Sequence, residues 1–288
     1  MRWRRHLFVA LIPLVPLCQI RVDRALGEFR PQQEVLYIHS GERLRRLVPG
    51  FEGILADIYW LRTVQYYGGQ RAFSAEKRYE LLRPLIDITT TLDPKLELAY
   101  RYGAIFLSEA WPSGPGKPVE GVEVLEKGVQ ALPLSWRLRW DLGSVWYFFL
   151  KDDKRAAQVL IDASKIPGAP FWLESLAGSM LVKGDRAVSR EIWRRQYENG
   201  WGNMKDNALH HLQLLDALDA RDALDETIAR FAERAGRRPR SFEEMVSMGL
   251  LRSAPTDPTG VPFEYDAGRG RARISRRSTL WNPKYENE

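Results

Sequence analysis

The sequence has one cysteine and four histidines, so several kinds of chemistry lack their usual groups. The single cysteine, Cys18, excludes an internal disulfide, a cysteine-rich zinc site and a Cys-x-x-Cys redox pair. His210 and His211 are adjacent, and on a helix they point about 100° apart, so they do not chelate one ion together. No Ser/His/Asp or Cys/His set can be assembled from neighbouring segments. We therefore expect no catalytic, cofactor or metal site, and a protein that is not an enzyme.

Long hydrophobic runs are also scarce, and the one unbroken run covers residues 7–18. It follows three arginines and contains two prolines, a pattern typical of a secretory signal or signal anchor. A helix over this run is shorter than a hydrocarbon core of about 30 Å. We expect residues 1–20 to be an uncleaved anchor, with a cleaved signal or a buried soluble helix as alternatives. The basic side should stay cytoplasmic, which predicts a single-pass bacterial inner-membrane protein whose bulk is periplasmic.

Three glycines recur in a way that suits a helical-repeat protein. Gly103, Gly143 and Gly178 are each followed three residues later by a large apolar residue, and a proline lies shortly before each of them. Glycine inside a helix costs about 1 kcal/mol relative to alanine, so its recurrence indicates a close crossing between two helices. Spacings of about 34 to 40 residues predict an all-α solenoid of stacked helix pairs. The second helices of three pairs are expected at residues 119–131, 154–164 and 186–198.

This order of features resembles the tetratricopeptide repeat (TPR) family. The small residue, the large apolar residue three places on, an alanine early in the second helix (Ala156, Ala187) and the closing proline follow the family's order. The resemblance implies a right-handed solenoid of helical hairpins over residues 51–200, with a divergent upstream pair at 51–67 and 75–90. An insertion at residues 111–118 departs from the pattern. The alternative is another kind of helical-hairpin stack.

The segment before the repeats is interpreted as a connector, residues 21–50, with a short strand at 35–39. The helix that follows carries Ala56, Asp57, Trp60, Leu61 and Arg62, which resembles a motif of bacterial membrane-anchored TPR proteins of unassigned role. One interpretation is a buried polar contact between the aspartate and the arginine of this motif. The other is an amphipathic first helix that seals the end of the solenoid.

Residues 201–235 are predicted to be a helical extension, either one long helix or two with a joint near Ala220. Aspartates recur there at every third position. Steps of three residues turn through about 300°, so the row drifts around a helix and does not converge on one ion. We interpret it as a solvated acidic face in preference to a metal site. Its members are Asp216, Asp219, Asp222 and Asp225.

The last part of the chain is predicted to be a small α+β hairpin module, residues 236–280, followed by a tail at 281–288. Ser241 and Glu244 form a capping box that opens a short helix, and Gly249 ends it. A β-hairpin should follow, with its turn at 267–270. Residues 239–265 resemble the C-terminal region of type II secretion major pseudopilins, although the pseudopilin methylation motif is absent. Arginines concentrate here and favour either an anionic surface or simple solubility: Arg237, Arg238, Arg240, Arg269, Arg271, Arg273, Arg276 and Arg277.

The TPR resemblance implies a concave groove, lined by the first helices of the pairs, that receives protein segments. Aromatic residues with a few charges are typical of protein-binding hot spots. The alternative for Trp140, Phe148 and Trp172 is that they form core between helices. The positions predicted to face the groove are Glu97, Tyr100, Leu107, Arg137, Trp140, Tyr147, Phe148, Trp172 and Lys183.

We therefore expect a membrane-tethered periplasmic adaptor that binds proteins of an envelope assembly. A type IV pilus, a secretion apparatus or an associated ABC transporter would each suit it. The alternatives are a permanent structural subunit of one inner-membrane complex and, more remotely, an enzyme whose site forms only with a partner. The net charge of +6 is modest, and no nucleic-acid partner is expected.

Overall fold

The computed structural model describes residues 20–21 and 40–286, and it divides the chain into two units, Met1–His39 and Ser40–Glu288. Most of the predicted anchor and the predicted strand at 35–39 lie outside the described residues. Within the part that is described, no helix has the length and apolar character needed to cross a membrane. The second unit is mostly helical, which confirms the all-α class.

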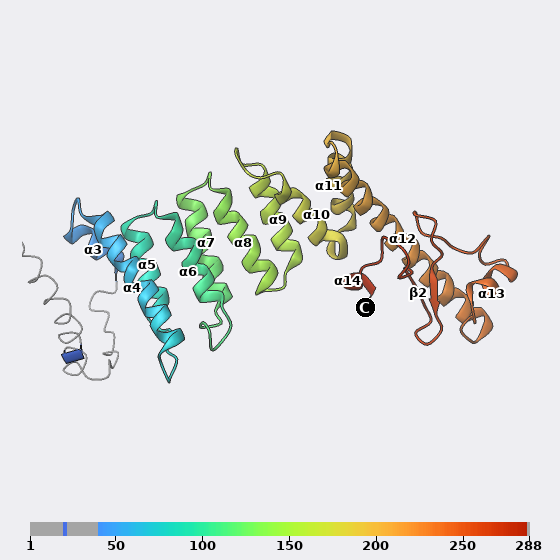
Figure 1. Ribbon diagram of the computed structural model, residues 1–288, viewed down its shortest axis with the longest axis horizontal. Coiled ribbons are helices and arrows are strands. Elements are labelled where there is room, and N and C mark those ends of the chain that lie inside the picture. Colours follow the sequence, from blue (N-terminus) through green and yellow to red (C-terminus); the bar gives the residue numbers. More distant parts are fainter. Residues whose placement is uncertain (1–19, 22–39, 287–288) are drawn as a thin grey trace, which may run out of the picture. The chain divides into compact units, whose positions relative to one another are not determined.

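The first nine helices of the second unit pack in chain order, each of them from α4 onward against the next. Figure 1 shows α4 to α11 as neighbouring helices of alternating direction. The short helix α3 packs on α5. The bounds are α3 (Gly41–Leu47), α4 (Glu52–Ala72), α5 (Leu82–Leu92), α6 (Glu97–Ser108), α7 (Pro118–Ala131), α8 (Trp136–Phe148), α9 (Asp153–Ser164), α10 (Trp172–Gly184), α11 (Arg186–Asn199) and α12 (Asn203–Ala235).

The three predicted second helices are confirmed as α7, α9 and α11, each within one residue of its predicted bounds. The upstream pair is confirmed only in part, because α5 begins at Leu82 and not at residue 75. The segment before it folds back over the end of α4. There Lys77 Nζ donates to the carbonyl of Gln70 at 2.8 Å, and the Arg78 amide donates to the Gln70 side chain at 2.9 Å. The segment is therefore held by hydrogen bonds to Gln70 and not by the hydrogen bonds of a helix.

A helix also forms where only a connector was predicted. Ser40 caps α3 by accepting a hydrogen bond from the Arg43 amide at 3.3 Å, and Leu44 is buried. Its seven residues are too few to show a helical period in the sequence. Of the two interpretations of the next helix, the buried contact between Asp57 and Arg62 is wrong, because Asp57 is exposed.

The recurrent glycines lie at close helix crossings, but not all with the predicted partner. A Cβ on Gly143 would lie 2.9 Å from Leu160 of α9, and one on Gly178 would lie 3.1 Å from Trp193 of α11. Both contacts are within the expected helix pair. Gly103 instead faces the preceding helix, since its Cβ would lie 3.0 Å from Ile86 of α5. The α6–α7 crossing relies on Gly128, whose Cβ would meet the ring of Tyr100 at 2.8 Å.

The extension after the repeats is one helix, α12, and its aspartate row is partly exposed, as predicted, but is also paired with arginines. Arg190 of α11 donates to Asp219 at 2.6 Å and also binds Asp216. Arg186, one turn earlier, donates to Asp219 at 2.9 Å and to Asp222 at 2.6 Å. The sequence analysis did not predict this pairing, which arises because α11 lies alongside α12 and places its arginines opposite the aspartate row.

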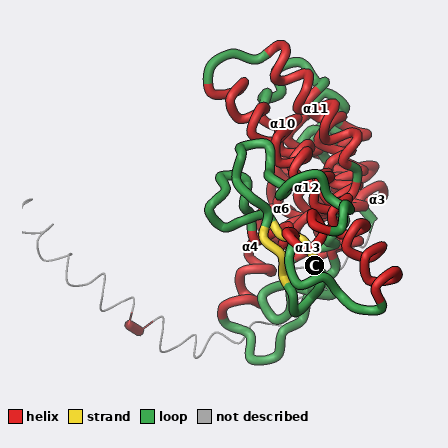
Figure 2. The backbone as a smooth tube through the Cα atoms, turned by 90° about the vertical axis from the view of Figure 1, so that its right-hand side faces the viewer, coloured by secondary structure: helices red, strands yellow, loops and turns green. Residues whose placement is uncertain are grey.

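The C-terminal module contains the predicted short helix and hairpin. Ser241 accepts from the Glu244 amide at 3.4 Å at the start of α13 (Phe242–Ser247). Strand β1 (Glu264–Asp266) pairs antiparallel with β2 (Arg271–Arg273), and Figure 2 shows the two short strands in yellow among loops. The Ala272 amide donates to Asp225 of α12 at 2.6 Å, which attaches the hairpin to the long helix.

Residues 281–286 are not a free tail, because they include the short helix α14 (Pro283–Glu286). Its Tyr285 is buried, and Arg221 of α12 donates to the Tyr285 carbonyl at 2.7 Å. The module therefore has no core of its own. One apolar cluster runs from Val182 of α10 and Trp193 of α11 through α12 to Phe263, Leu280 and Tyr285.

Candidate functional site

Five aromatic side chains of α8 and α10 form a partly exposed surface, which we call the aromatic surface. The Trp172 ring lies edge-to-face with two rings of α8, with 5.0 Å between its centre and that of Trp140 and 6.5 Å to that of Trp136. Tyr147 and Phe148 meet edge-to-face at 4.9 Å. The first turn of α8 is capped by Ser135, which accepts from the Leu138 amide at 3.3 Å and so fixes where the ring row begins.

The aromatic surface combines anchoring to the core with exposure to solvent. Trp136, Trp140 and Tyr147 are half-buried and pack against the cluster that α9 and α10 build from residues such as Leu160. Phe148 is 58% exposed and Trp172 is 39% exposed. The two interpretations left open for Trp140 thus both hold in part, whereas Phe148 is not core. Rings that are held on one side and free on the other can receive a partner with little further ordering.

Cations lie against and beside these rings. The Arg137 guanidinium lies 4.7 Å from the centre of the Trp136 ring. The Lys284 ammonium of α14 lies 5.7 Å from the centre of the Tyr147 ring. Lys183, at the end of α10, is exposed. A ring face attracts a cation electrostatically, so these contacts hold positive charge next to the aromatic surface.

Two of the predicted groove residues are core, and their assignment to the groove is wrong. Tyr100 and Leu107 of α6 are 0% and 1% exposed. The Tyr100 hydroxyl donates to the Thr90 carbonyl at 3.2 Å, and burial raises the pKa of Tyr100 to about 12. The groove positions were counted from the recurrent glycines. Because Gly103 faces α5 instead of α7, α6 is rotated relative to α8 and α10, and the same count selects buried positions. Glu97 of this helix is half-buried.

An ion pair between first helices was missed by the sequence analysis. Arg101 of α6 donates to Asp141 of α8, whose side chain is only 8% exposed. Burial raises the pKa of Asp141, although the arginine hydrogen bond opposes that shift. Both residues lie two positions before a recurrent glycine, Gly103 or Gly143. A search for opposite charges at equivalent repeat positions would therefore have found this contact.

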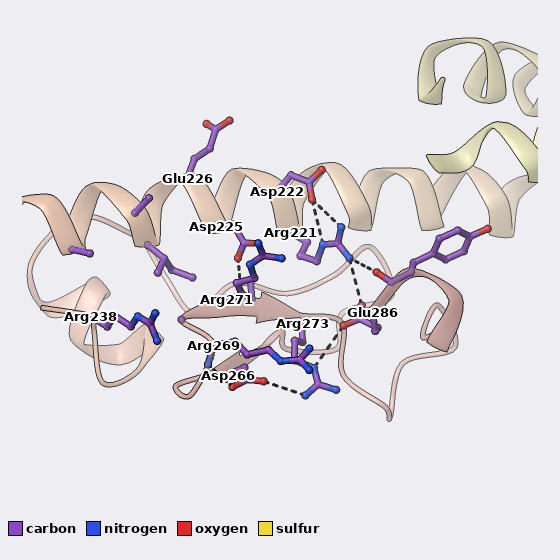
Figure 3. Close-up of a pocket in the computed structure, with 16 residues that line it drawn as sticks. Arg221, Asp222, Asp225, Glu226, Arg238, Asp266, Arg269, Arg271, Arg273 and Glu286 are labelled. Carbon is purple, nitrogen blue, oxygen red and sulfur yellow. Dashed lines mark hydrogen bonds and ion pairs between the residues drawn. The ribbon is translucent and has the colours of Figure 1, made fainter. Parts of the chain in front are cut away.

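A cavity of about 570 Å³ lies between α12, the hairpin and α14. Figure 3 shows Arg221, Asp225, Arg271, Arg273 and Glu286 between α12 and the hairpin, whereas Glu226 points away from them. Arg221 pairs with Asp222 at 3.0 Å and with Glu286 at 3.8 Å, and Arg273 reaches Asp266 at 3.4 Å. Burial raises the pKa of Glu286. The cavity is lined by equal numbers of arginines and acidic residues, so it presents no single sign of charge to a ligand.

The predicted arginine-rich patch is partly neutralised in the same way. Arg237 pairs with Glu244, which lowers the pKa of Glu244 to about 2. Arg238 donates to the Gly268 carbonyl at 2.8 Å, and Arg273 pairs with Asp266. These arginines therefore help to hold the module together. Arg276 contacts the ring of Trp281 at 5.7 Å from its centre.

Within residues 20–21 and 40–286, no group of three or more His, Cys, Asp or Glu residues is placed to hold a metal ion. No family model matches the chain, and neither a curated protein nor a solved structure matches it at a significant level. Function is therefore inferred here from surface geometry, and the aromatic surface is the candidate site.

Proposed function

We propose that this protein is a membrane-tethered periplasmic adaptor of the TPR type, which binds partner proteins on the aromatic surface of α8 and α10. The observation that carries this proposal is a set of five aromatic rings in two contacting groups, one around Trp172 and the other the pair Tyr147 and Phe148. Phe148 and Trp172 are the most exposed of the five. Large rings with neighbouring cations are typical of the residues that dominate protein–protein binding energy.

The succession of helix pairs supports the TPR part of the proposal. From α4 to α11 each helix packs against the next, and glycines allow the close crossings α6–α7, α8–α9 and α10–α11. Repetition of such pairs with a constant rotation generates a right-handed solenoid whose first helices share one side. The Arg101–Asp141 pair between α6 and α8 is consistent with first helices that lie next to one another.

The chemistry of the surface specifies the class of partner. Rings of tryptophan, tyrosine and phenylalanine favour apolar side chains, and Arg137 and Lys284, which lie over two of the rings, favour acidic ones. We therefore propose a protein segment that carries apolar and acidic residues, presented by a component of an envelope assembly. The tether is proposed from the apolar run at residues 7–18 and its basic flank, which lie outside the described residues.

The proposal is tested by co-purification of the full chain from detergent-solubilised membranes, with partners identified by mass spectrometry. The test variant is Phe148→Ala with Trp172→Ala, and we expect it to lose the partners that the unchanged chain captures. The matched control is Phe171→Ala, which removes a ring that is 68% exposed and adjacent in sequence to Trp172. Capture of the same partners by the double variant, at equal folded amounts, would show that the aromatic surface is not the binding site.

A further inference from the structure

The outer face of α4 carries a row of large apolar side chains in solvent. Phe51 at its N-cap and Ile54, Ile58 and Leu61 within it are 64%, 62%, 53% and 60% exposed. Their spacing of three, four and three residues places them on one side of the helix. Leu47, at the end of α3, extends the row and is 70% exposed. Contiguous exposed patches of this kind mark interaction surfaces, whereas single exposed apolar residues are ordinary.

Among the described residues, the helix α4 is held by its opposite side and not by this face. Ala56, Thr63 and Tyr67 are buried there. The Tyr67 ring stacks on Phe106 of α6 at 4.1 Å, and the Tyr67 hydroxyl donates to Glu109 at 2.6 Å. The position of the exposed row is thus fixed by contacts in which the row takes no part.

Positive charge lies at the start of the same face. Three arginines of α3 are exposed: Arg43, Arg45 and Arg46. The turn that joins α3 to α4 is well defined, since the Phe51 amide donates to the Val48 carbonyl at 3.0 Å and Gly50 has a φ of +87°. The Gly50 amide donates to the Glu52 side chain at 2.9 Å and closes the turn. The turn therefore holds α3 next to the start of the row, with Arg45 close enough to Glu52 to act on its charge and with one exposed acidic residue, Glu42, among the arginines.

An apolar face with arginines at its edge suits the surface of a membrane that contains anionic lipids. Such a face buries its apolar side chains about 5–10 Å deep, at the boundary between headgroups and acyl chains. Arginines near such a surface are attracted electrostatically to anionic headgroups. Two acidic residues adjoin the row in sequence, Glu52 beside Phe51 and Asp57 beside Ile58. Glu52 accepts a hydrogen bond from the Gly50 amide in the turn, and Asp57 is exposed and lies about 100° around the helix from Ile58, so it can remain in the headgroup layer.

The order of the chain supports the same occupant. The helices α3 and α4 are the first described elements after the apolar run of residues 7–18. If that run is in the bilayer, the intervening 21 residues reach at most about 75 Å even when fully extended. Of all the described helices, α3 and α4 are thus the nearest along the chain to the membrane. This step rests on the tether of the proposed function.

We propose that the exposed face of α4, together with the arginines of α3, lies on the surface of the membrane to which the chain is tethered. The row Phe51, Ile54, Ile58 and Leu61 enters the headgroup–acyl boundary, and Arg43, Arg45 and Arg46 bind lipid phosphates. The contact orients the helical unit and leaves the aromatic surface of α8 and α10 for protein partners.

The test uses the full chain in vesicles of phosphatidylethanolamine and phosphatidylglycerol. Cys18→Ala removes the natural thiol, and Ile58→Cys introduces one site for a fluorophore. Nitroxide groups on the acyl chains of the lipid report contact by quenching. We expect the label at residue 58 to be quenched at least two-fold more than the same label at Leu134→Cys, a matched site that is 75% exposed on the segment before α8. Adding Arg45→Gln and Arg46→Gln should weaken the quenching at residue 58, and replacing phosphatidylglycerol by neutral lipid should do the same.

The outcomes separate this inference from the proposed tether. Equal quenching at residues 58 and 134, while the chain stays with the vesicles after alkaline extraction, would overturn the membrane contact and leave the tether intact. Release of the whole chain on extraction would contradict the tether itself. Disulfide cross-linking between two chains at residue 58, without quenching by lipid, would identify the face as a contact between copies and would also overturn the inference.

Discussion

Two exposed apolar surfaces of this protein differ in how their side chains are held. On α8 and α10 the rings touch one another, as Trp172 and Trp140 do at 5.0 Å, and they rest partly on the core. On α4 the row is mainly aliphatic, more than half exposed, and flanked by arginines at one end. Fixed rings present a defined shape, which a folded partner can match. The aliphatic side chains of α4 suit a fluid apolar phase such as the lipid boundary, where a partner does not have to match a specific shape.

The largest expected effect tests whether the exposed rings contribute to folding stability. A buried aromatic residue serves as the reference. We expect Tyr100→Ala to lower the free energy of unfolding by about 3–5 kcal/mol, as large-to-small changes of buried aromatic residues do. Phe148→Ala should change it by less than about 0.5 kcal/mol, because exposed positions contribute little. Urea unfolding followed by circular dichroism measures both. A loss of similar size for the two variants would return Phe148 to the core.

The second prediction alters each surface separately and measures protein binding and lipid contact for both variants. Phe148→Ala with Trp172→Ala should weaken partner binding about 30-fold or more, the equivalent of a hot-spot loss of about 2 kcal/mol. Ile54→Ser with Ile58→Ser should leave partner binding unchanged and reduce contact with lipid. Binding of a purified partner and nitroxide quenching are measured on both variants. If either pair of substitutions impaired both properties, the two surfaces would not be separate sites.

The third prediction concerns the pH dependence of folding stability, which we expect to come from a buried histidine and not from either surface. His211 of α12 is stacked on Trp193 at 4.0 Å, and burial lowers its pKa to about 4. In the unfolded chain a histidine has a pKa of about 6.5, so below that pH the unfolded state binds a proton that the folded state refuses. Stability should therefore fall as pH drops from about 7 to about 4. His211→Phe should remove part of this dependence in denaturant titrations, and an unchanged pH profile would contradict it.

The smallest effect is expected at the ion pairs between α11 and α12. Arg190 contacts Asp216 and Asp219, but the side chains are 26%, 54% and 50% exposed. Exposed pairs contribute about 0.2–1 kcal/mol and are weakened by salt. Arg190→Gln should therefore lower the melting temperature by only a few degrees at low salt, with a smaller difference in 1 M salt. A change that salt does not reduce would mean that packing of the arginine stem is responsible.

Much of the helical order followed from local signals. The second helices at 119–131, 154–164 and 186–198 were placed within one residue because prolines, caps and apolar spacing act within a helix. The hairpin followed from its turn residues for the same reason. Helix α3 was missed because seven residues carry no visible period, and α5 was started too early because Lys77 and Arg78 bind back to Gln70.

The candidate site was predictable only where two helices had the same rotation. Counting from Gly143 and Gly178 selected Phe148 and Trp172 correctly as exposed residues, and Trp140 as a residue that is half-buried. The same count from Gly103 selected Tyr100 and Leu107, which are buried. One difference, the contact of Gly103 with Ile86 of α5, turns α6 and decides which of its faces is inside.

The sequence by itself determined the all-α class, the succession of helix pairs and the close helix crossings at Gly143 and Gly178, because glycine, proline and apolar spacing act over a few residues. Only the tertiary structure decided which aspartates meet Arg186 and Arg190 and that Tyr285 joins the core of α10 and α12. It also decided that no described element packs over the apolar row of α4. These outcomes depend on contacts between residues distant in the chain. Such contacts are set by helix rotation and packing, which no local pattern specifies.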